Sequence, residues 1–311
     1  MRVIFMGTPD FAVGTLEALV QAGHEVVLAV TQPDKPQGRK QKLVAPPVKE
    51  KALELGIPVF QPKRVREPEA LEMLKSHEPE LIVVAAFGQI LPKELLEMPK
   101  YGCINVHASL LPKYRGAAPI QWAILNGDDV TGVTIMRMDV GLDTGDMIAK
   151  TEVKIAPEDT GGTLFDRLAE AGARLCVETI PSIVDGTAIY TPQDEAAATK
   201  VGMISKKDGL IDFSRAARAI ECQVRGLDPW PSAYTFLAGK TLKIWSADVC
   251  EGGEAADAGT VVFLKKDSFG VQTGDGILVC KEVQLEGKKR MSAGDFLRGN
   301  ALEVGMTLGR S

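Results

Sequence analysis

Asn105 and His107, an amide and an imidazole, lie at the end of a short apolar segment. This segment opens the stretch CINVHASLLPKYRGAAPIQWAI (103–124), in which Asn105 and His107 are two residues apart. Residues at this spacing in an extended chain point to the same face, so both side chains are expected to project from the end of one strand. Alone, His107 would more often be structural and Asn105 would be a turn residue. Their shared position makes both candidates for chemistry.

The two residue types have complementary chemical abilities. An asparagine amide is a neutral hydrogen-bond donor that can bind a developing oxyanion. A histidine changes its protonation near neutral pH, so it can accept, relay or donate a proton. Asn105 and His107 together would therefore suit a reaction in which negative charge develops on an oxygen while a proton moves.

The elements around these residues predict an open α/β sheet. Short apolar runs predict buried strands at 3–6, 26–31, 81–86 and 103–106. Amphipathic segments predict helices at 11–22, 47–55, 68–76 and 92–97. Strands that alternate with helices pair in parallel through right-handed crossovers, which predicts a mostly parallel, Rossmann-like sheet. Such sheets bind ligands at the carboxyl ends of their strands.

A hairpin and a long helix follow the parallel strands. The strand-like stretches 132–138 and 146–155 have no helix between them, which predicts an antiparallel hairpin around the loop DVGLDTGD. A helix is predicted at 160–184, with Thr160 as its N-cap and Gly186 just past its end.

The last third of the chain has a different pattern. The segment 185–205 is polar and lacks periodicity, so it is predicted to be a linker. After a helix at 214–226, short strands separated by Gly-rich turns predict a small all-β, OB-like barrel. We therefore expect a catalytic domain at 1–184, the linker, and a barrel domain at 206–311.

Composition argues against several classes of protein. The five cysteines are scattered without a C-x-x-C pair, which indicates reduced thiols in the cytoplasm rather than a disulfide framework. The three histidines and the cysteines have no metal-ligand spacing, so no metal is predicted. The longest apolar run, 81–87, is far shorter than the roughly 20 residues that span a bilayer, so no membrane contact is predicted. The turn GTPDFAVG (7–14) lacks G-x-G-x-x-G, which argues against a nicotinamide cofactor.

The distribution of charge limits how the chain could bind nucleic acid. The net charge of −5 argues against a general nucleic-acid binder, which is usually basic. The region from 206 onward carries 15 basic and 14 acidic residues, so the acidic excess lies before it. Any contact with RNA must therefore use local basic patches.

Two stretches resemble the signatures of the 10-formyltetrahydrofolate-dependent formyltransferases. The first is matched by Asn105, His107, Ser109–Pro112 (SLLP), Arg115-Gly116 and Pro119-Ile120. The second is matched by MDVGLDTGD (138–146), with Asp143 at the catalytic aspartate of the family. The resemblance implies catalytic roles for Asn105, His107 and Asp143, and direct formyl transfer to an amine through a tetrahedral intermediate. In that reaction the carboxylate would orient the imidazole and favour its charged form.

The same resemblance implies where the folate binds. The loops AAFGQIL (85–91) and SLLP (109–112) would line its pocket, with backbone groups contacting the pterin. The expected folate-binding residues are Phe87, Gly88, Gln89, Ile90, Leu91, Ser109, Leu110, Leu111 and Pro112. Without the resemblance, 85–91 would be only a buried strand and its turn.

Two features indicate the formyl acceptor. The loop TQPDKPQGRKQKLVAPPVK (31–49) is basic, follows a strand end and resembles the insertion with which tRNA-formylating members of the family engage the acceptor arm. The stretches 226–245 and 273–299 resemble the barrel of the same members. Phosphate contacts are expected from Lys35, Arg39, Lys40, Lys42, Lys206, Lys207, Lys288, Lys289 and Arg290. The acceptor would then be methionyl initiator tRNA, and the chain is expected to act as a monomer.

Three alternatives stay open from the sequence. A sugar-amine formyltransferase would use the same donor, but a different appended domain would be expected. The barrel could also merely brace the catalytic domain, and the chain could bind folate or tRNA without activity. Intact Asn105, His107 and Asp143 argue against a module without activity.

Overall fold

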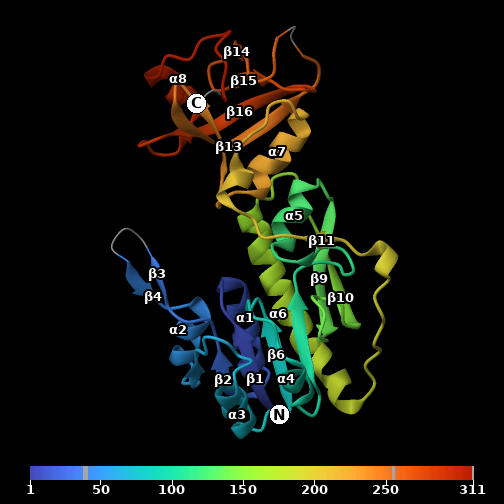
Figure 1. The fold of residues 1–311 in the computed structure, drawn as a ribbon. Helices are drawn as coiled ribbons and strands as arrows, with labels where there is room; N and C mark the ends of the chain where they lie inside the picture. The colour runs from blue at the N-terminus through green and yellow to red at the C-terminus, as the bar shows by residue number, and fades with distance from the viewer. Residues whose placement is uncertain (38–40, 254–255, 310–311) are drawn as a thin grey trace. The chain divides into compact units, whose positions relative to one another are not determined.

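The computed structural model describes residues 1–37, 41–253 and 256–309. These residues form two compact units, which are described separately (Figure 1). The first unit comprises Met1–Pro119, Val130–Lys154 and Phe165–Val201, and the second comprises Ile120–Asp129, Ile155–Leu164 and Gly202–Ser311. Two short segments, 120–129 and 155–164, thus belong to the second unit although the chain on either side of each belongs to the first.

A seven-stranded sheet organises the first unit. Its order is β10-β9-β7-β6-β1-β2-β5. The strands are β1 (Arg2–Gly7), β2 (Glu25–Val30), β5 (Val59–Phe60), β6 (Leu81–Ala85), β7 (Cys103–His107), β9 (Val130–Arg137) and β10 (Met147–Lys154). Strands β1, β2, β5, β6 and β7 pair in parallel, whereas β9 is antiparallel to both β7 and β10. The predicted parallel sheet and the predicted antiparallel hairpin are both confirmed.

Helices cover this sheet and bury its strands. They are α1 (Asp10–Gln21), α2 (Pro47–Glu54), α3 (Pro68–Ser76), α4 (Lys93–Glu97) and α6 (Gly161–Asp185). The apolar side chains of β1 are fully buried, as expected for the central strand of a covered parallel sheet. Thr160 caps α6 by accepting a hydrogen bond from the backbone N–H of Thr163 at 3.2 Å. Gly186, directly after α6, has a φ of +78°.

Short elements that the sequence did not predict lie around the carboxyl ends of the strands. β3 (Lys35–Gln37) and β4 (Lys42–Val44) form a two-stranded antiparallel hairpin after β2. β8 (Arg115–Gly116) pairs in parallel with β11 (Lys200–Val201), which belongs to the segment predicted as a linker. The 3-10 helix η1 (Glu195–Ala197) lies in the same segment. Residues 185–201 of this segment belong to the first unit, and residues 202–205 belong to the second.

The second unit contains an antiparallel sheet in the order β12-β13-β16-β15-β14, with β17 beside β16. Its strands are β12 (Ala233–Leu237), β13 (Lys240–Cys250), β14 (Val261–Leu264), β15 (Phe269–Gln272), β16 (Ile277–Leu285) and β17 (Met291–Ser292). Its helices are α5 (Pro119–Leu125), η2 (Lys206–Gly209), α7 (Ala217–Gly226) and α8 (Ala293–Gly299). The predicted fold class, a mostly parallel α/β sheet followed by an all-β domain, is confirmed.

The start of α7 corrects the sequence prediction. We expected a helix from 214, but it begins at Ala217. The Asp212 carboxylate accepts hydrogen bonds from the backbone N–H and the hydroxyl of Ser214. This local turn competes with helical hydrogen bonding.

The segments 120–129 and 155–164 make hydrogen bonds with later residues of the second unit. The indole N–H of Trp122 donates to the carbonyl of Gly202 at 3.0 Å. Arg225 donates to the carbonyl of Asp159 at 2.9 Å, and the N–H of Gly162 donates to the carbonyl of Asp228 at 2.9 Å. Over the described part of the chain, no helix is both long and apolar enough to cross a membrane.

Candidate active site

Asn105 and His107 lie at the carboxyl end of β7, in the interior of the sheet. Asn105 is opposite Val84 of β6 and Met136 of β9, and His107 is opposite Thr134 of β9. The carboxyl ends of β6 and β7 therefore meet here, at the edge where parallel sheets bind ligands.

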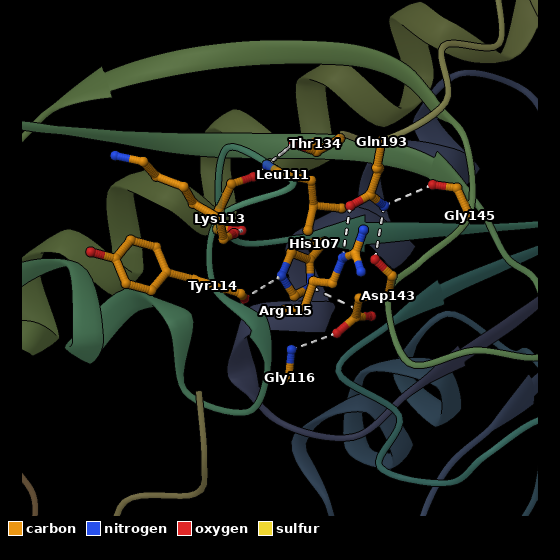
Figure 2. A network of polar contacts seen from close by, with 11 residues as sticks. His107, Leu111, Lys113, Tyr114, Arg115, Gly116, Thr134, Asp143, Gly145 and Gln193 are labelled. Carbon is orange, nitrogen blue, oxygen red and sulfur yellow. Dashed lines mark hydrogen bonds and ion pairs between the residues drawn. The ribbon is translucent and has the colours of Figure 1, made fainter. Parts of the chain in front are cut away.

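His107 is buried, with 6% of its surface exposed, and its ring is held on one side. Nε2 is 3.0 Å from the carbonyl oxygen of Tyr114 (Figure 2). Because a carbonyl oxygen can only accept, Nε2 carries a proton in this arrangement. The neutral ring then has its lone pair on Nδ1, which lies 3.7 Å from Oδ1 of Asp143. This separation is longer than a hydrogen bond.

Asp143 lies in a tightly folded loop between β9 and β10. Its φ of +54° is uncommon for a non-glycine residue. Its Oδ2 accepts a hydrogen bond from the N–H of Gly116 at 2.8 Å. Inside the loop, Oδ1 of Asp139 accepts from the N–H of Gly141 at 2.9 Å and from the hydroxyl of Thr144 at 2.7 Å. These contacts fix the direction of the Asp143 carboxylate.

Asn105 differs from His107 and Asp143 because its side chain has no hydrogen-bond partner among the described residues. It is partly exposed, and no group of the described residues makes a hydrogen bond to its amide. His107 and Asp143, in contrast, both have protein partners. The Asn105 amide is therefore available to a bound molecule.

Residues that the sequence analysis missed hold the Asp143 loop from outside. The Gln193 amide donates to the carbonyls of Asp143 and Gly145, both at 2.8 Å (Figure 2). Arg115 donates from Nε to Oε1 of Gln193 at 2.9 Å, and its two terminal nitrogens donate to Glu195 at 3.0 and 2.7 Å. This hydrogen bond from Arg115 holds the pKa of Glu195 below its ordinary value.

One signal in the sequence could have led to these residues. Arg115 stood in the first signature, and a fully buried arginine needs hydrogen-bond and charge partners. The structure gives Arg115 an exposure of 1% and places those partners about 80 residues away along the chain. Nothing local in the sequence singles out Gln193 or Glu195.

The first expected folate loop combines buried and exposed residues. Phe87 and Leu91 are buried at 2% and 4% exposure. The Gln89 side chain accepts from the N–H of Val65 at 2.7 Å and donates to the carbonyl of Pro62 at 3.2 Å. These bonds hold the backbone of the segment that contains Pro62 and Val65. Gly88 and Ile90 are exposed, Ile90 at 80%.

The second expected folate loop is fixed by polar contacts at its backbone. The Ser109 hydroxyl donates to the carbonyl of Lys113 at 2.6 Å, and the N–H of Leu111 donates to Oγ1 of Thr134 at 3.1 Å. Lys150 donates to the carbonyl of Leu111 at 2.5 Å, and burial lowers the pKa of this lysine. Leu110 and Pro112 are partly exposed, while Ser109 and Leu111 are buried.

The basic loop after β2 is anchored by hydrogen bonds to the carboxylate of Asp34. Lys49 donates to both carboxylate oxygens of Asp34, at 2.8 and 2.9 Å, and Gln61 donates to the same carboxylate at 2.7 Å. Lys35 and Lys42 are exposed on the β3–β4 hairpin. Arg39 and Lys40, which were also expected to contact tRNA, lie outside the described residues.

The basic residues of the second unit fall into two groups. Lys206 and Lys207 are exposed in η2, and Lys288 and Lys289 are exposed in the turn between β16 and β17. Arg290 instead pairs with Glu282 and, at 3.4 Å, with Asp228, and it lies 4.9 Å from the ring centre of Trp245. Arg290 is therefore engaged within the protein.

Among the described residues, no three or more His, Cys, Asp and Glu side chains form a group that could hold a metal ion. The site brings together an amide without a protein hydrogen-bond partner among the described residues, an imidazole whose Nε2 lies against a backbone carbonyl, and a carboxylate held by a backbone N–H.

Comparisons with known proteins identify the family. Residues 1–180 match the family model of formyl transferases, and residues 203–301 match that of the formyl transferase C-terminal domain. A methionyl-tRNA formyltransferase of Agathobacter rectalis is 61% identical over 305 residues, covering 98% of both chains. That of Lachnospira eligens is 53% identical over 314 residues, covering 99% of this chain and 100% of the relative. The solved structure of WlaRD, a sugar 3N-formyl transferase, shares the fold at 21% identity with a TM-score of 0.67, covering 93% of this chain and 99% of that chain. The chain therefore belongs to the methionyl-tRNA formyltransferase family of formyl transferases.

Proposed function

We propose that the protein transfers the formyl group of 10-formyltetrahydrofolate to the α-amino group of methionyl initiator tRNA. The observation that carries this proposal is the arrangement at the end of β7. The Asn105 amide, which has no hydrogen-bond partner among the described residues, lies two residues from His107, whose Nδ1 faces Asp143 at 3.7 Å. The family relationship supports both the reaction and the acceptor.

Each of the three residues has a distinct role in the proposed mechanism. Asn105 donates to the carbonyl oxygen of the formyl group as that oxygen becomes negative during addition of the amine. His107 accepts the amine proton at Nδ1, because Nε2 is already committed to the carbonyl of Tyr114. Asp143 then stabilises the imidazolium that forms, at the atom that has just gained the proton. As the oxyanion collapses, the bond between the formyl carbon and N10 of the folate breaks. The imidazolium returns the proton to N10, and tetrahydrofolate leaves.

The nearby potential nucleophiles are occupied, which supports direct transfer. The Ser109 hydroxyl donates to a backbone carbonyl at 2.6 Å. Burial raises the pKa of the Cys103 thiol to about 12, so this thiol is protonated at neutral pH. Neither of these two groups is therefore prepared to carry the formyl group in a covalent formyl-enzyme. The amine of the acceptor is therefore the nucleophile in the proposed reaction.

The loop 85–91 fits a folate at this edge of the sheet. Ala86, Gly88 and Ile90 are exposed after the end of β6, so their backbone groups can meet the donors and acceptors of a pterin. Ile90 offers an exposed apolar surface beside them. When bound, the folate supplies the activated formyl group. We propose the same role for the partly exposed Leu110 and Pro112 of the second loop.

Charge on both units supports tRNA as the acceptor. In the proposed arrangement, Lys35, Arg39, Lys40 and Lys42 contact the acceptor arm. A second group of exposed lysines, in the C-terminal region, contacts other phosphates. This second group comprises Lys206, Lys207, Lys288 and Lys289. We assign catalysis to 1–184 and tRNA binding to 206–311, in a monomer that acts in the cytoplasm, where charged tRNA is found.

A formylation assay tests the acceptor directly. Purified protein is given 10-formyltetrahydrofolate with either methionyl initiator tRNA or a nucleotide-linked amino sugar. Transfer to the charged tRNA with a kcat/KM at least about a hundredfold higher is the expected result, because two groups of lysines favour a polyanion. Preferential transfer to the amino sugar would overturn the proposal in favour of a sugar-amine formyltransferase. Binding of both folate and tRNA without transfer would indicate a binding module.

A further inference from the structure

The Gln193 side chain connects two backbone carbonyls of the Asp143 loop. Its Nε2 donates to the carbonyls of Asp143 and Gly145, both at 2.8 Å (Figure 2). Both N–H groups of the amide are thereby used on one loop. One of these bonds is made to Asp143 itself, the residue whose carboxylate faces His107. A displacement of Gln193 would therefore change the direction of that carboxylate.

Arg115 determines which way the Gln193 amide points. Its Nε–H donates to Oε1 of Gln193 at 2.9 Å, so the oxygen faces the guanidinium and the NH₂ group faces the loop. Two further bonds to Glu195 hold the guanidinium itself. A flipped amide would place two donors against each other at Arg115 and an oxygen against two carbonyls at the loop. The buried guanidinium excludes that orientation.

The Asp143 loop needs external support because its backbone is strained. A non-glycine residue with a φ of +54° lies in a sparsely populated region, which costs on the order of 1 kcal/mol. Such conformations persist where surrounding contacts impose them. The contacts here come from Gln193 at the carbonyl of Asp143 and from Gly116 at its carboxylate.

We propose that Gln193, oriented by Arg115, is a positioning residue for formyl transfer that keeps the Asp143 carboxylate directed at Nδ1 of His107. This inference rests on the proposed function. Gln193 acts through Asp143, and no contact with either substrate is required of it. The segment 191–201 is thus a functional part of the catalytic unit.

A matched pair of variants separates positioning from general stability. Gln193→Met keeps the length of the side chain and removes both donors. Gln223 makes an equivalent contact in the second unit, donating to the carbonyls of Asp208 at 2.7 Å and Leu210 at 3.1 Å. Gln223→Met therefore removes the same chemical groups from a buried two-carbonyl contact that does not involve the Asp143 loop. Both variants are expected to lower Tm.

Kinetics on the full-length protein form the first test. Gln193→Met is expected to lower kcat about 10- to 100-fold, because displacing a catalytic group by about 1 Å can cost about a hundredfold, with KM for both substrates changed less than about threefold. Gln223→Met is expected to keep kcat within about threefold of wild type. In an Asp143→Ala background, Gln193→Met should change the rate less than about twofold. An equal loss in both backgrounds, or an equal loss in Gln223→Met, would overturn the proposal.

A second donor-deficient variant keeps the result interpretable. Gln193→Glu preserves an oxygen that can accept from Arg115 but cannot donate to the two carbonyls. It is expected to lose kcat at least as strongly as Gln193→Met, because an anionic oxygen would face the carbonyl oxygens. Near wild-type kcat in Gln193→Glu would show that the two donated bonds are not needed.

Amide hydrogen exchange tests the positioning without any activity measurement. The N–H of Gly116 donates to Oδ2 of Asp143, so its exchange rate reports whether the carboxylate is in place. Gln193→Met should accelerate this exchange about tenfold and Gln223→Met should not. Unchanged exchange in Gln193→Met would overturn the inference. If the wild-type protein transferred no formyl group to charged tRNA, the proposed function would fail while this measurement still decided the inference.

Discussion

The Asp143 loop and the β3–β4 hairpin both follow strands of the same sheet, yet they are held in different ways. In the loop, the carbonyls of Asp143 and Gly145, the Asp143 carboxylate and the side chains of Asp139 and Thr144 are all hydrogen bonded. In the hairpin, Lys35 and Lys42 are exposed. The hydrogen bonds near it are made by Lys49 to the carboxylate of Asp34, which directly precedes β3.

This difference matches the demands of the two proposed tasks. A proton acceptor and its carboxylate must be placed within a fraction of an ångström, and a dense hydrogen-bond network achieves this. Attraction of phosphates depends on the number of charges and weakens only gradually with distance. Exposed lysines on a hairpin that is anchored by the Lys49–Asp34 pair are sufficient for that purpose.

The largest expected effect on kcat is at His107, beside the Asp143 loop. His107→Ala should lower kcat about a thousandfold, because it removes the proposed proton acceptor. A formylation assay under single-turnover conditions measures this loss. His24→Ala is a suitable control, since His24 lies between α1 and β2, away from the carboxyl ends of the strands. Activity of His107→Ala equal to wild type would show that His107 is not the proton acceptor, and the Asp143 loop would then have no catalytic group to position.

Gly116→Ala should have the next largest effect. Gly116 has a φ of +106°, and an added Cβ would clash with the carbonyl oxygen of Val201. The strain is expected to cost about 1–3 kcal/mol and to displace the N–H that binds Asp143, lowering kcat about tenfold or more.

Thermal unfolding and kcat together check the Gly116 prediction. Gly239→Ala provides the control, because Gly239 also has a positive φ of +76° but nothing lies within 4 Å of its added Cβ. It should lose stability and keep kcat. Parallel loss of kcat in both variants would mean that stability, not the placement of Asp143, limits activity.

The exposed lysines of the hairpin should affect the acceptor alone, and by less. The double variant Lys35→Ala/Lys42→Ala should raise KM for charged tRNA about 3- to 10-fold and flatten its dependence on salt, with KM for the folate within about twofold. Arg39→Ala is expected to act in the same direction. Lys75→Ala, at the end of α3, should change neither KM. Comparable loss of folate binding would contradict the assignment.

The smallest effect concerns the base of the hairpin and its response to pH. The hydrogen bond from Lys49 is the main reason that the pKa of Asp34 lies below its ordinary value of 3.8. A depressed folded pKa stabilises the protein above the unfolded value and loses this contribution as the pH falls through the folded value. The Tm of Asp34→Asn should therefore be slightly below that of wild type at pH 7, and the difference should vanish in strong acid. A difference independent of pH would contradict this reasoning.

Local signals explain what the sequence could predict. The alternation of apolar runs and amphipathic helices predicted the parallel sheet, and the spacing of Asn105 and His107 predicted their common strand end. The proximity of Asp143 to His107 came from the resemblance of two signatures. The catalytic roles themselves stay predictions until the variants are measured.

The supporting contacts could not be predicted because they join distant residues. The bonds from Arg115 to Gln193 and to Glu195 span 78 and 80 residues. β8 and β11 contain two residues each, too few for a periodic pattern. The polar composition of 185–205 suggested a linker because hydrogen-bonding side chains look the same in sequence whether their partners are water or protein.

The interleaving of the two compact units has a practical consequence for engineering. The helix around Trp122 and the turn around Asp159 precede the end of α6 in the chain. Their hydrogen-bond partners are Gly202 and Arg225, which follow it. A fragment truncated at 184 would lose these partners and expose the surfaces they cover. Chimaeras between relatives should therefore exchange 120–129 and 155–164 together with the C-terminal part, as one co-inherited block.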